Sequence, residues 1–229
     1  TPELLLKQVV QAFLNEEPDA LVEEVVGHMT RHSTALSNTR VAVMILDTVS
    51  RAGNVKAMME LWNAFQTKLN LSRSLPLYEV LLAGFASAGN QSKVSEVVKK
   101  MRADKLGLSA RAFSLMIKGF LKNGMLDEVL SKMTDMHGMG YALPTFAVAQ
   151  LFRLATEASR STEVFQTVKN ANLPLPAEAM EAMLEDCAKR GDFKLARQVE
   201  KLTRETQDVL PASSYDALLK VYTLAGDIH

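Results

Sequence analysis

The amino-acid sequence predicts an all-α protein, an α-solenoid of stacked helix-turn-helix repeats with about six full 35-residue repeats and a partial one. Only 11 Gly and 7 Pro interrupt 229 residues, of which 48% are apolar, so helices are the expected element. No stretch alternates apolar and polar residues over the length of a strand. Apolar residues recur instead at helical spacing, and turn residues recur at a period near 35.

Turn glycines set the period, with spacings of 36, 35, 67 and 35 residues. The spacing of 67 holds two units, and Ser159 stands where the missing glycine would be. A glycine here ends the first helix of a unit, because it can adopt the left-handed conformation after the C-cap. The Asn or Asp that often follows, such as Asn54 or Asp192, can cap the second helix. The glycines are Gly53, Gly89, Gly124, Gly191 and Gly226.

Each unit begins with four apolar residues at i, i+3, i+4 and i+7, the pattern of one buried helical stripe. A similar stripe, sixteen residues further on, predicts a second helix in each unit, and the pair cannot bury both stripes without stacked neighbours. The first stripes are Leu6, Val9, Val10, Phe13; Ala42, Ile45, Leu46, Val49; Tyr78, Leu81, Leu82, Phe85; Phe113, Met116, Ile117, Phe120; Val148, Leu151, Phe152, Ala155; Met180, Met183, Leu184, Cys187; and Tyr215, Leu218, Leu219, Tyr222.

The repeats are expected to form a single solenoid domain over residues 1–229. Leu-Pro pairs close several units, since proline starts the next helix cleanly. The fifth repeat is three residues short, so its second helix should be about one turn shorter and the superhelical twist should break there. The expected repeats are 3–38, 39–74, 75–109, 110–144, 145–176, 177–211 and the incomplete 212–229.

The hairpins carry Tyr or Phe at the fourth position of the repeat, Gly at the fifteenth and Met at the twenty-seventh, and in these features the chain resembles the pentatricopeptide repeat family. The matches are best from Tyr78 to Ser109 and from Phe113 to Pro144. The tetratricopeptide repeat has a 34-residue period and a Trp in its first helix, whereas Trp62 lies in a predicted second helix. The resemblance covers essentially the whole chain. It implies a right-handed α-solenoid that binds single-stranded RNA in a mitochondrion or plastid, one base per repeat.

The resemblance also implies which residues would contact RNA. In the family, the fifth and last residues of a repeat read the base edge, and the second residue stacks on the base. The family's usual pairs, Asn, Thr or Ser with Asp or Asn, are not met in any repeat; Ser114, for example, is paired with Pro144, which has no side-chain donor or acceptor. The candidates for RNA contact, all in repeats one to four, are Lys7, Asn38, Arg40, Arg51, Ser74, Ser109, Arg111, Ser114 and Lys122.

Charge divides the expected groove into two halves, although 26 basic and 26 acidic residues leave the chain with no net charge. The first four repeats present bases against one acid, Glu79, so RNA is expected there and not beyond Thr145. Two functions stay open: an RNA-binding factor in transcript processing, stability or translation, and a protein-interaction scaffold or accessory structural subunit of a large organelle complex. The candidates for binding a basic protein segment are Glu157, Glu178, Glu181 and Asp216.

No residue pattern indicates an enzyme, a cofactor or a metal site. His28 and His32 have the spacing of a metal pair, but no second cluster completes a ligand set. The longest apolar run, 41–46, is far shorter than the roughly 20 residues of a membrane span. Cys187, the single cysteine, falls in a buried stripe, so it should be a core residue.

Overall fold

The computed structural model describes residues 2–12, 18–32, 39–206 and 212–225. These residues form thirteen helices and no strand, and the predicted fold class, all-α with stacked helix-turn-helix repeats, is confirmed. Within the described ranges, none of the helices combines the length and the apolar character needed to cross a membrane.

Repeats one to six each contribute a first and a second helix, and the seventh contributes a first helix to the described residues, at the places that the apolar stripes predict. The first helices are α1 (Pro2–Ala12), α4 (Thr39–Arg51), α6 (Leu75–Ser87), α8 (Ala110–Lys122), α10 (Thr145–Glu157), α12 (Ala177–Arg190) and α14 (Ala212–Ala225). The second helices are α2 (Pro18–Arg31), α5 (Val55–Thr67), α7 (Gln91–Ala103), α9 (Leu126–Gly138), α11 (Ser161–Asn170) and α13 (Phe193–Thr206).

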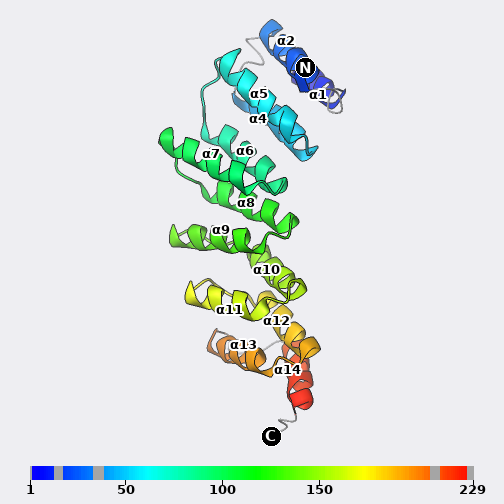
Figure 1. The fold of residues 1–229 in the computed structure, drawn as a ribbon, viewed down its shortest axis with the longest axis vertical. Coiled ribbons are helices and arrows are strands. Elements are labelled where there is room, and N and C mark those ends of the chain that lie inside the picture. Colours follow the sequence, from blue (N-terminus) through cyan, green and yellow to red (C-terminus); the bar gives the residue numbers. More distant parts are fainter. Residues whose placement is uncertain (1, 13–17, 33–38, 207–211, 226–229) are drawn as a thin grey trace. The chain divides into compact units, whose positions relative to one another are not determined.

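The helices divide into two compact units, unit 1 (Thr1–Asn123, holding α1 to α8) and unit 2 (Gly124–His229, holding α9 to α14). In unit 1, α4 packs against α1 and α6, and α6 packs against α8; in unit 2, α12 packs against α10 and α14. The second helices α7, α11 and α13 each pack on the first helix of their own repeat (Figure 1). First helices therefore form the continuous row within a unit. That all repeats make one solenoid domain stays a prediction.

The turns within and between repeats depend on residues with left-handed backbone conformation. Ser159 has φ +57°, so it adopts the conformation that glycine supplies in the other repeats, as the spacing predicted. Asn54 caps α5 by accepting a hydrogen bond from the N–H of Ala57 at 3.0 Å, and Asp192 does the same for Leu195 at the start of α13. Four second helices are also followed by a residue with left-handed backbone, which the spacing of the turn glycines did not predict. These residues are Asn70, Lys105, Gly140 and Asn172.

The fifth repeat is shortened where the sequence predicted. Helix α11 has 10 residues, whereas α5, α7 and α9 have 13 each. Three residues are close to one helical turn, so the deletion removes a turn without rotating the apolar face of α11 away from the core. Val164, Phe165 and Val168 accordingly remain buried.

The predicted first-helix stripes form the core, except in the first and last repeats. In the first repeat Leu6 and Val10 are buried and Val9 is half-buried, and Phe13 lies outside the described residues. In repeats two to six every residue of the stripe is buried. In α14, Leu218 is buried, but Tyr215 is 43% exposed and Leu219 is 65% exposed, so the prediction is wrong for these two residues. In α4, α6, α10 and α12 the first helix packs against the second helix of its own repeat, whereas α14 is the last helix among the described residues.

Candidate functional site

One face of each first helix carries the second, fifth, ninth and thirteenth residues of the repeat, and we call this row the polar stripe. Offsets of three, four and four residues place these side chains on one side of a helix. In α8 the polar stripe is Arg111, Ser114, Lys118 and Lys122, and its three cations are exposed. Lys118 was missed in the sequence, although its spacing from Arg111 follows the same helical pattern.

The polar stripes of α1 and α4 are also basic, but part of their charge is compensated. Lys7 and Arg40 are exposed. The guanidinium of Arg51 lies 2.9 Å from the carboxylate of Asp47, one turn earlier on α4. Asp47 was left out of the charge balance drawn from the sequence, so Arg51 contributes less positive field than expected.

The predicted base-reading serines lie in different environments. Ser114 is half-buried and donates its hydroxyl to the carbonyl oxygen of Ala110 at 3.0 Å. Ser74 immediately precedes α6 with an extended backbone, and its buried Oγ has no hydrogen-bond partner among the described residues. Asn38 lies outside the described residues. The structure therefore places Ser74 at the start of α6 and Ser114 on α8, in different repeats of unit 1.

Three residues of the third and fourth repeats meet at one point of unit 1. The hydroxyl of Ser109 donates to Oε1 of Glu79 at 2.6 Å, and Nε of Arg111 lies 3.4 Å from Oε2 of the same carboxylate. Glu79 is only 6% exposed, which is unusual for a carboxylate. The fifth and last residues of repeat three, the predicted base-reading pair, are therefore hydrogen-bonded to each other.

Neighbouring first helices of unit 1 approach each other at glycines in the tenth position of the repeat. A Cβ placed on Gly119 of α8 would lie 2.6 Å from the backbone of Ala86 in α6, a distance that real side chains do not allow. The side-chain amide of Asn123 donates to the carbonyl oxygens of Ala86 and Ser87 at 3.1 and 2.9 Å, which fixes the end of α8 on α6. The polar stripes of α6 and α8 are consequently held close together.

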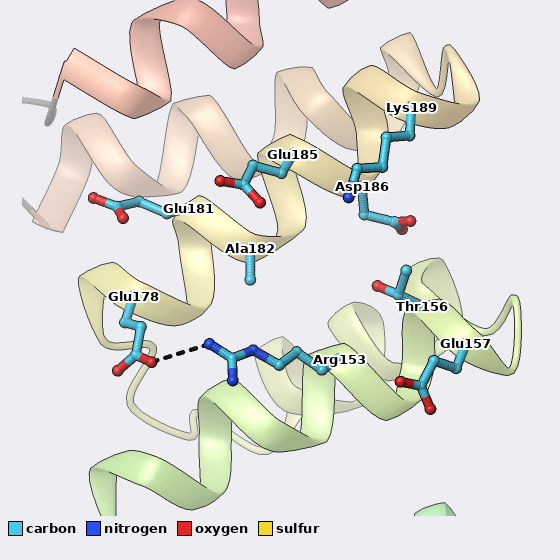
Figure 2. A pocket seen from close by; sticks show the side chains of 9 residues that line it. All are labelled: Arg153, Thr156, Glu157, Glu178, Glu181, Ala182, Glu185, Asp186 and Lys189. Carbon is cyan, nitrogen blue, oxygen red and sulfur yellow. Dashed lines mark hydrogen bonds and ion pairs between the residues drawn. The ribbon is translucent and has the colours of Figure 1, made fainter.

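In unit 2 the corresponding face is hollow and acidic. A cavity of about 350 Å³ lies between α10 and α12, and we call it the acidic groove. Figure 2 shows Glu178, Glu181 and Glu185 along α12, opposite Arg153 and Glu157 of α10, with an ion pair of 3.5 Å between Arg153 and Glu178. Its lining residues are Arg153, Thr156, Glu157, Glu178, Glu181, Ala182, Glu185, Asp186 and Lys189.

The fourth predicted acid, Asp216, lines a neighbouring cavity of about 330 Å³ between α12 and α14. Glu185 and Lys189 line both cavities, so the two hollows are adjacent along α12. Lys189 and Lys220 lie beside Asp216 in the second cavity and offset its charge. The structure thus brings Glu157, Glu178 and Glu181 together and places Asp216 apart, in a more balanced setting.

The tenth residue of the sixth repeat, Asp186, is a buried carboxylate beside the acidic groove. It accepts a hydrogen bond from the hydroxyl of Ser161 at 2.8 Å and pairs with Arg190 one turn later on α12. These partners compensate the cost of burying a charge. Its role is therefore to join α12 to the start of α11.

Cys187 and His28, the remaining titratable candidates, contact residues of the fold itself. Burial, and then the nearby carboxylates of Asp192 and Asp186, raise the pKa of the Cys187 thiol to about 12, so it is not poised as a nucleophile. Nε2 of His28 lies 3.1 Å from the carboxylate of Glu24. Among the described residues, His, Cys, Asp and Glu side chains form no group of three or more that could hold a metal ion.

These features define an α-helical repeat protein whose stacked first helices present a polar face. Residues 111–141 match the family model described as PPR repeat, and residues 67–123 match the model described as pentatricopeptide repeat domain. A chloroplastic pentatricopeptide repeat-containing protein of Arabidopsis thaliana is 27% identical over 106 residues, which are 46% of this chain and 14% of that protein. Over residues 67–141 the chain is therefore similar in sequence to pentatricopeptide repeats.

Solved structures show the same fold. The pentatricopeptide repeat protein PPR10 from maize superposes with a TM-score of 0.53 at 18% identity, covering 99% of this chain and 37% of that one. Nuclear proteinaceous RNase P 2 from A. thaliana gives a TM-score of 0.52 at 16% identity, covering 79% of this chain and 41% of that one. This chain therefore spans less than half the length of each of these proteins.

Proposed function

We propose that the chain is a non-enzymatic helical-repeat module that binds single-stranded RNA through unit 1. The observation that carries the proposal is the row of exposed cations on α8, continued by Lys7 and Arg40 on the earlier first helices. Phosphate neutralisation by such cations supplies most of the affinity in sequence-independent binding. PPR10 has been crystallised with an 18-nt psaJ RNA element, and that ligand indicates the class of partner to test here.

The proposed contact is to the RNA backbone rather than to base edges. At the one predicted base-reading pair whose two side chains meet, Ser109 and Glu79 satisfy each other. The other described pairs include a proline or an apolar residue and have few hydrogen-bonding groups to offer. Binding should therefore depend weakly on sequence. The proposed localisation of the protein is an organelle, a mitochondrion or plastid, as for the chloroplastic relative.

A salt titration tests this function. The affinity of the protein for fluorescent oligouridylate should fall as salt rises, with a slope in log affinity against log salt of about 0.7 for each phosphate neutralised. Binding should reach the micromolar range near physiological salt. Absence of binding at low salt, or an affinity that does not depend on salt, would refute the RNA proposal.

A second candidate function is supported by the acidic groove of unit 2, which would suit a basic segment of a partner protein. Five carboxylates line the cavity against two cations, Arg153 and Lys189. Such a surface repels phosphate and attracts Lys and Arg side chains. A scaffold function predicts that an arginine-rich peptide binds the wild type and that changing Glu157, Glu178 and Glu181 to Gln abolishes binding. Equal affinity of the two proteins for the peptide would exclude this function.

A further inference from the structure

Glu79 differs from the other charged residues of the polar stripes. It lies on α6 within the basic face of unit 1, and it is buried, whereas the cations around it on α4 and α8 are exposed. Its two carboxylate oxygens have separate partners, Ser109 on Oε1 and Arg111 on Oε2. A buried carboxylate thus lies beside Arg111, one of the exposed cations of α8.

The position of this carboxylate is fixed by the start of α8. Ser109 is the N-cap of α8, and its hydroxyl accepts from the N–H of Ala112 at 3.0 Å while it donates to Glu79. The N-terminal end of a helix also favours a negative charge nearby. Because an unpaired buried carboxylate is costly, Glu79 must keep its partners.

We propose that Glu79 is a built-in competitor of the RNA backbone for Arg111, and this inference rests on the proposed function. The Arg111 side chain is 74% exposed and can reach a phosphate, but its charge is offset by the carboxylate 3.4 Å away. A phosphate held by Arg111 would lie within about one Debye length of Glu79, roughly 8 Å at physiological ionic strength, so their repulsion is only partly screened. Glu79 therefore lowers the affinity of unit 1 for RNA and reduces the contribution of Arg111.

Glu79 could have the opposite role and help Arg111 to bind phosphate, and this role can be distinguished by experiment. If Glu79 served to orient Arg111 toward the phosphate, removing its charge would release the arginine and weaken binding. The two roles thus predict opposite signs for one substitution. Competition is favoured because the distance of 3.4 Å from Nε of Arg111 to the carboxylate gives little directional control. The carboxylate is also closer to Ser109, at 2.6 Å, than to the arginine.

Glu79→Gln tests the competition, because glutamine has the same shape and keeps an oxygen to accept from Ser109. Its affinity for oligouridylate at physiological salt should rise roughly threefold to tenfold, and the salt slope should steepen by about 0.7. Arg111→Ser should have little effect in the wild type but should cancel the gain in the Glu79→Gln background. Weaker binding by Glu79→Gln, or equal losses from Arg111→Ser in both backgrounds, would overturn the proposal.

Two controls separate charge from packing. Ser109→Ala removes the hydrogen bond but keeps the carboxylate, so it should give no gain in affinity. Glu79→Leu removes the charge without burying a polar group, and it should reproduce the gain even if the glutamine variant is poorly folded. A loss of binding in Glu79→Leu with an unchanged melting temperature would contradict the proposal.

The failure of this inference can be told apart from the failure of the proposed function. A variant with Arg40→Ser and Lys122→Ser leaves Glu79 and Arg111 in place and removes exposed cations only. If that variant loses affinity while Glu79→Gln binds as the wild type does, the competition is refuted and the RNA function stands. If the wild type shows no salt-dependent binding, both are refuted.

Discussion

The two units differ at the tenth residue of the repeat, which lies at a contact between first helices in unit 1 and beside a cavity in unit 2. In unit 1 this residue is glycine in α6 and α8, and the backbone of α6 comes so near to Gly119 that no side chain fits. In unit 2 the same positions hold Leu154 and Asp186. Asp186 lines a cavity of about 350 Å³ between α10 and α12.

The polar stripes of the two units also differ in charge. In unit 1 they hold six cations and two acids, and in unit 2 three cations and five acids. The cations of α8 in unit 1 are exposed, whereas four of the five acids of unit 2 line the acidic groove. One repeat pattern thus produces two surfaces of opposite charge, because the residues of the polar stripe differ between the two units.

The largest effect is expected for core residues of the first helices. Ile117 in unit 1 and Leu219 in unit 2 both occupy the eighth position of a repeat, but Ile117 is fully buried and Leu219 is 65% exposed. Ile117→Ala should lower the free energy of unfolding by about 2 to 5 kcal/mol, and Leu219→Ala by less than about 0.5 kcal/mol. Urea denaturation measures both. Similar costs at the two positions would show that α14 is covered in solution.

A smaller loss is expected from closing the space between α6 and α8. Gly119→Ala should lower the free energy of unfolding by about 1 to 3 kcal/mol through overpacking, even though alanine favours helices. Gly138, in the last turn of α9, is the matched control, because a Cβ there would meet no atom within 4 Å. Gly138→Ala should be neutral or slightly stabilising. A neutral Gly119→Ala would break the link between the tenth residue and helix spacing.

The smallest effect concerns alkaline pH and should be similar in the two units. Burial, and then the hydrogen bond to Asp104, raise the pKa of Tyr78 to about 12; burial and Glu200 do the same for Tyr222 in unit 2. The folded protein keeps these protons where the unfolded chain, with a tyrosine pKa near 10, releases them. The stability that these two tyrosines contribute is therefore fully present below pH 10 and is lost as the pH rises toward 12.

Replacing either tyrosine by Phe should reduce the slope of the free energy of unfolding against pH between 10 and 12. Denaturant titrations at several pH values give this slope for the wild type, Tyr78→Phe and Tyr222→Phe. Identical slopes for all three proteins would mean that the tyrosines titrate normally.

The fold followed from the sequence because its signals are local and repeated. Apolar stripes predicted the thirteen described helices as six hairpin pairs and one further first helix, α14. Ser159 and the three missing residues predicted the left-handed turn and the shorter α11. The methionines of the stripes, such as Met116 and Met183, are buried core residues, as expected. The exposure of Leu219 was not predictable, because the pattern identifies a stripe and not the helix that covers it.

The candidate site was only partly predictable. The clustering of Glu157, Glu178 and Glu181 followed from their positions, but the cavity depends on the spacing of α10 and α12, which no local pattern encodes. The compensation of Arg51 by Asp47, and of Arg111 by Glu79 and Ser109, requires contacts between side chains in three dimensions. Arg153, Glu185 and Lys118 could have been found by applying the polar-stripe spacing to every first helix.

The comparison of the two units is tested most directly by RNA binding of two charge variants. The basic variant carries Arg40→Ser, Arg51→Ser, Arg111→Ser and Lys122→Ser in unit 1, and the acidic variant carries Glu157→Gln, Glu178→Gln and Glu181→Gln in unit 2. Affinity for oligouridylate is measured by fluorescence anisotropy across a salt series, after circular dichroism has shown that both variants are folded. The basic variant should lose roughly tenfold or more in affinity and bind with a shallower salt slope, whereas the acidic variant should lose nothing. Equal losses in both variants, or no loss in either, would contradict the assignment of RNA to unit 1.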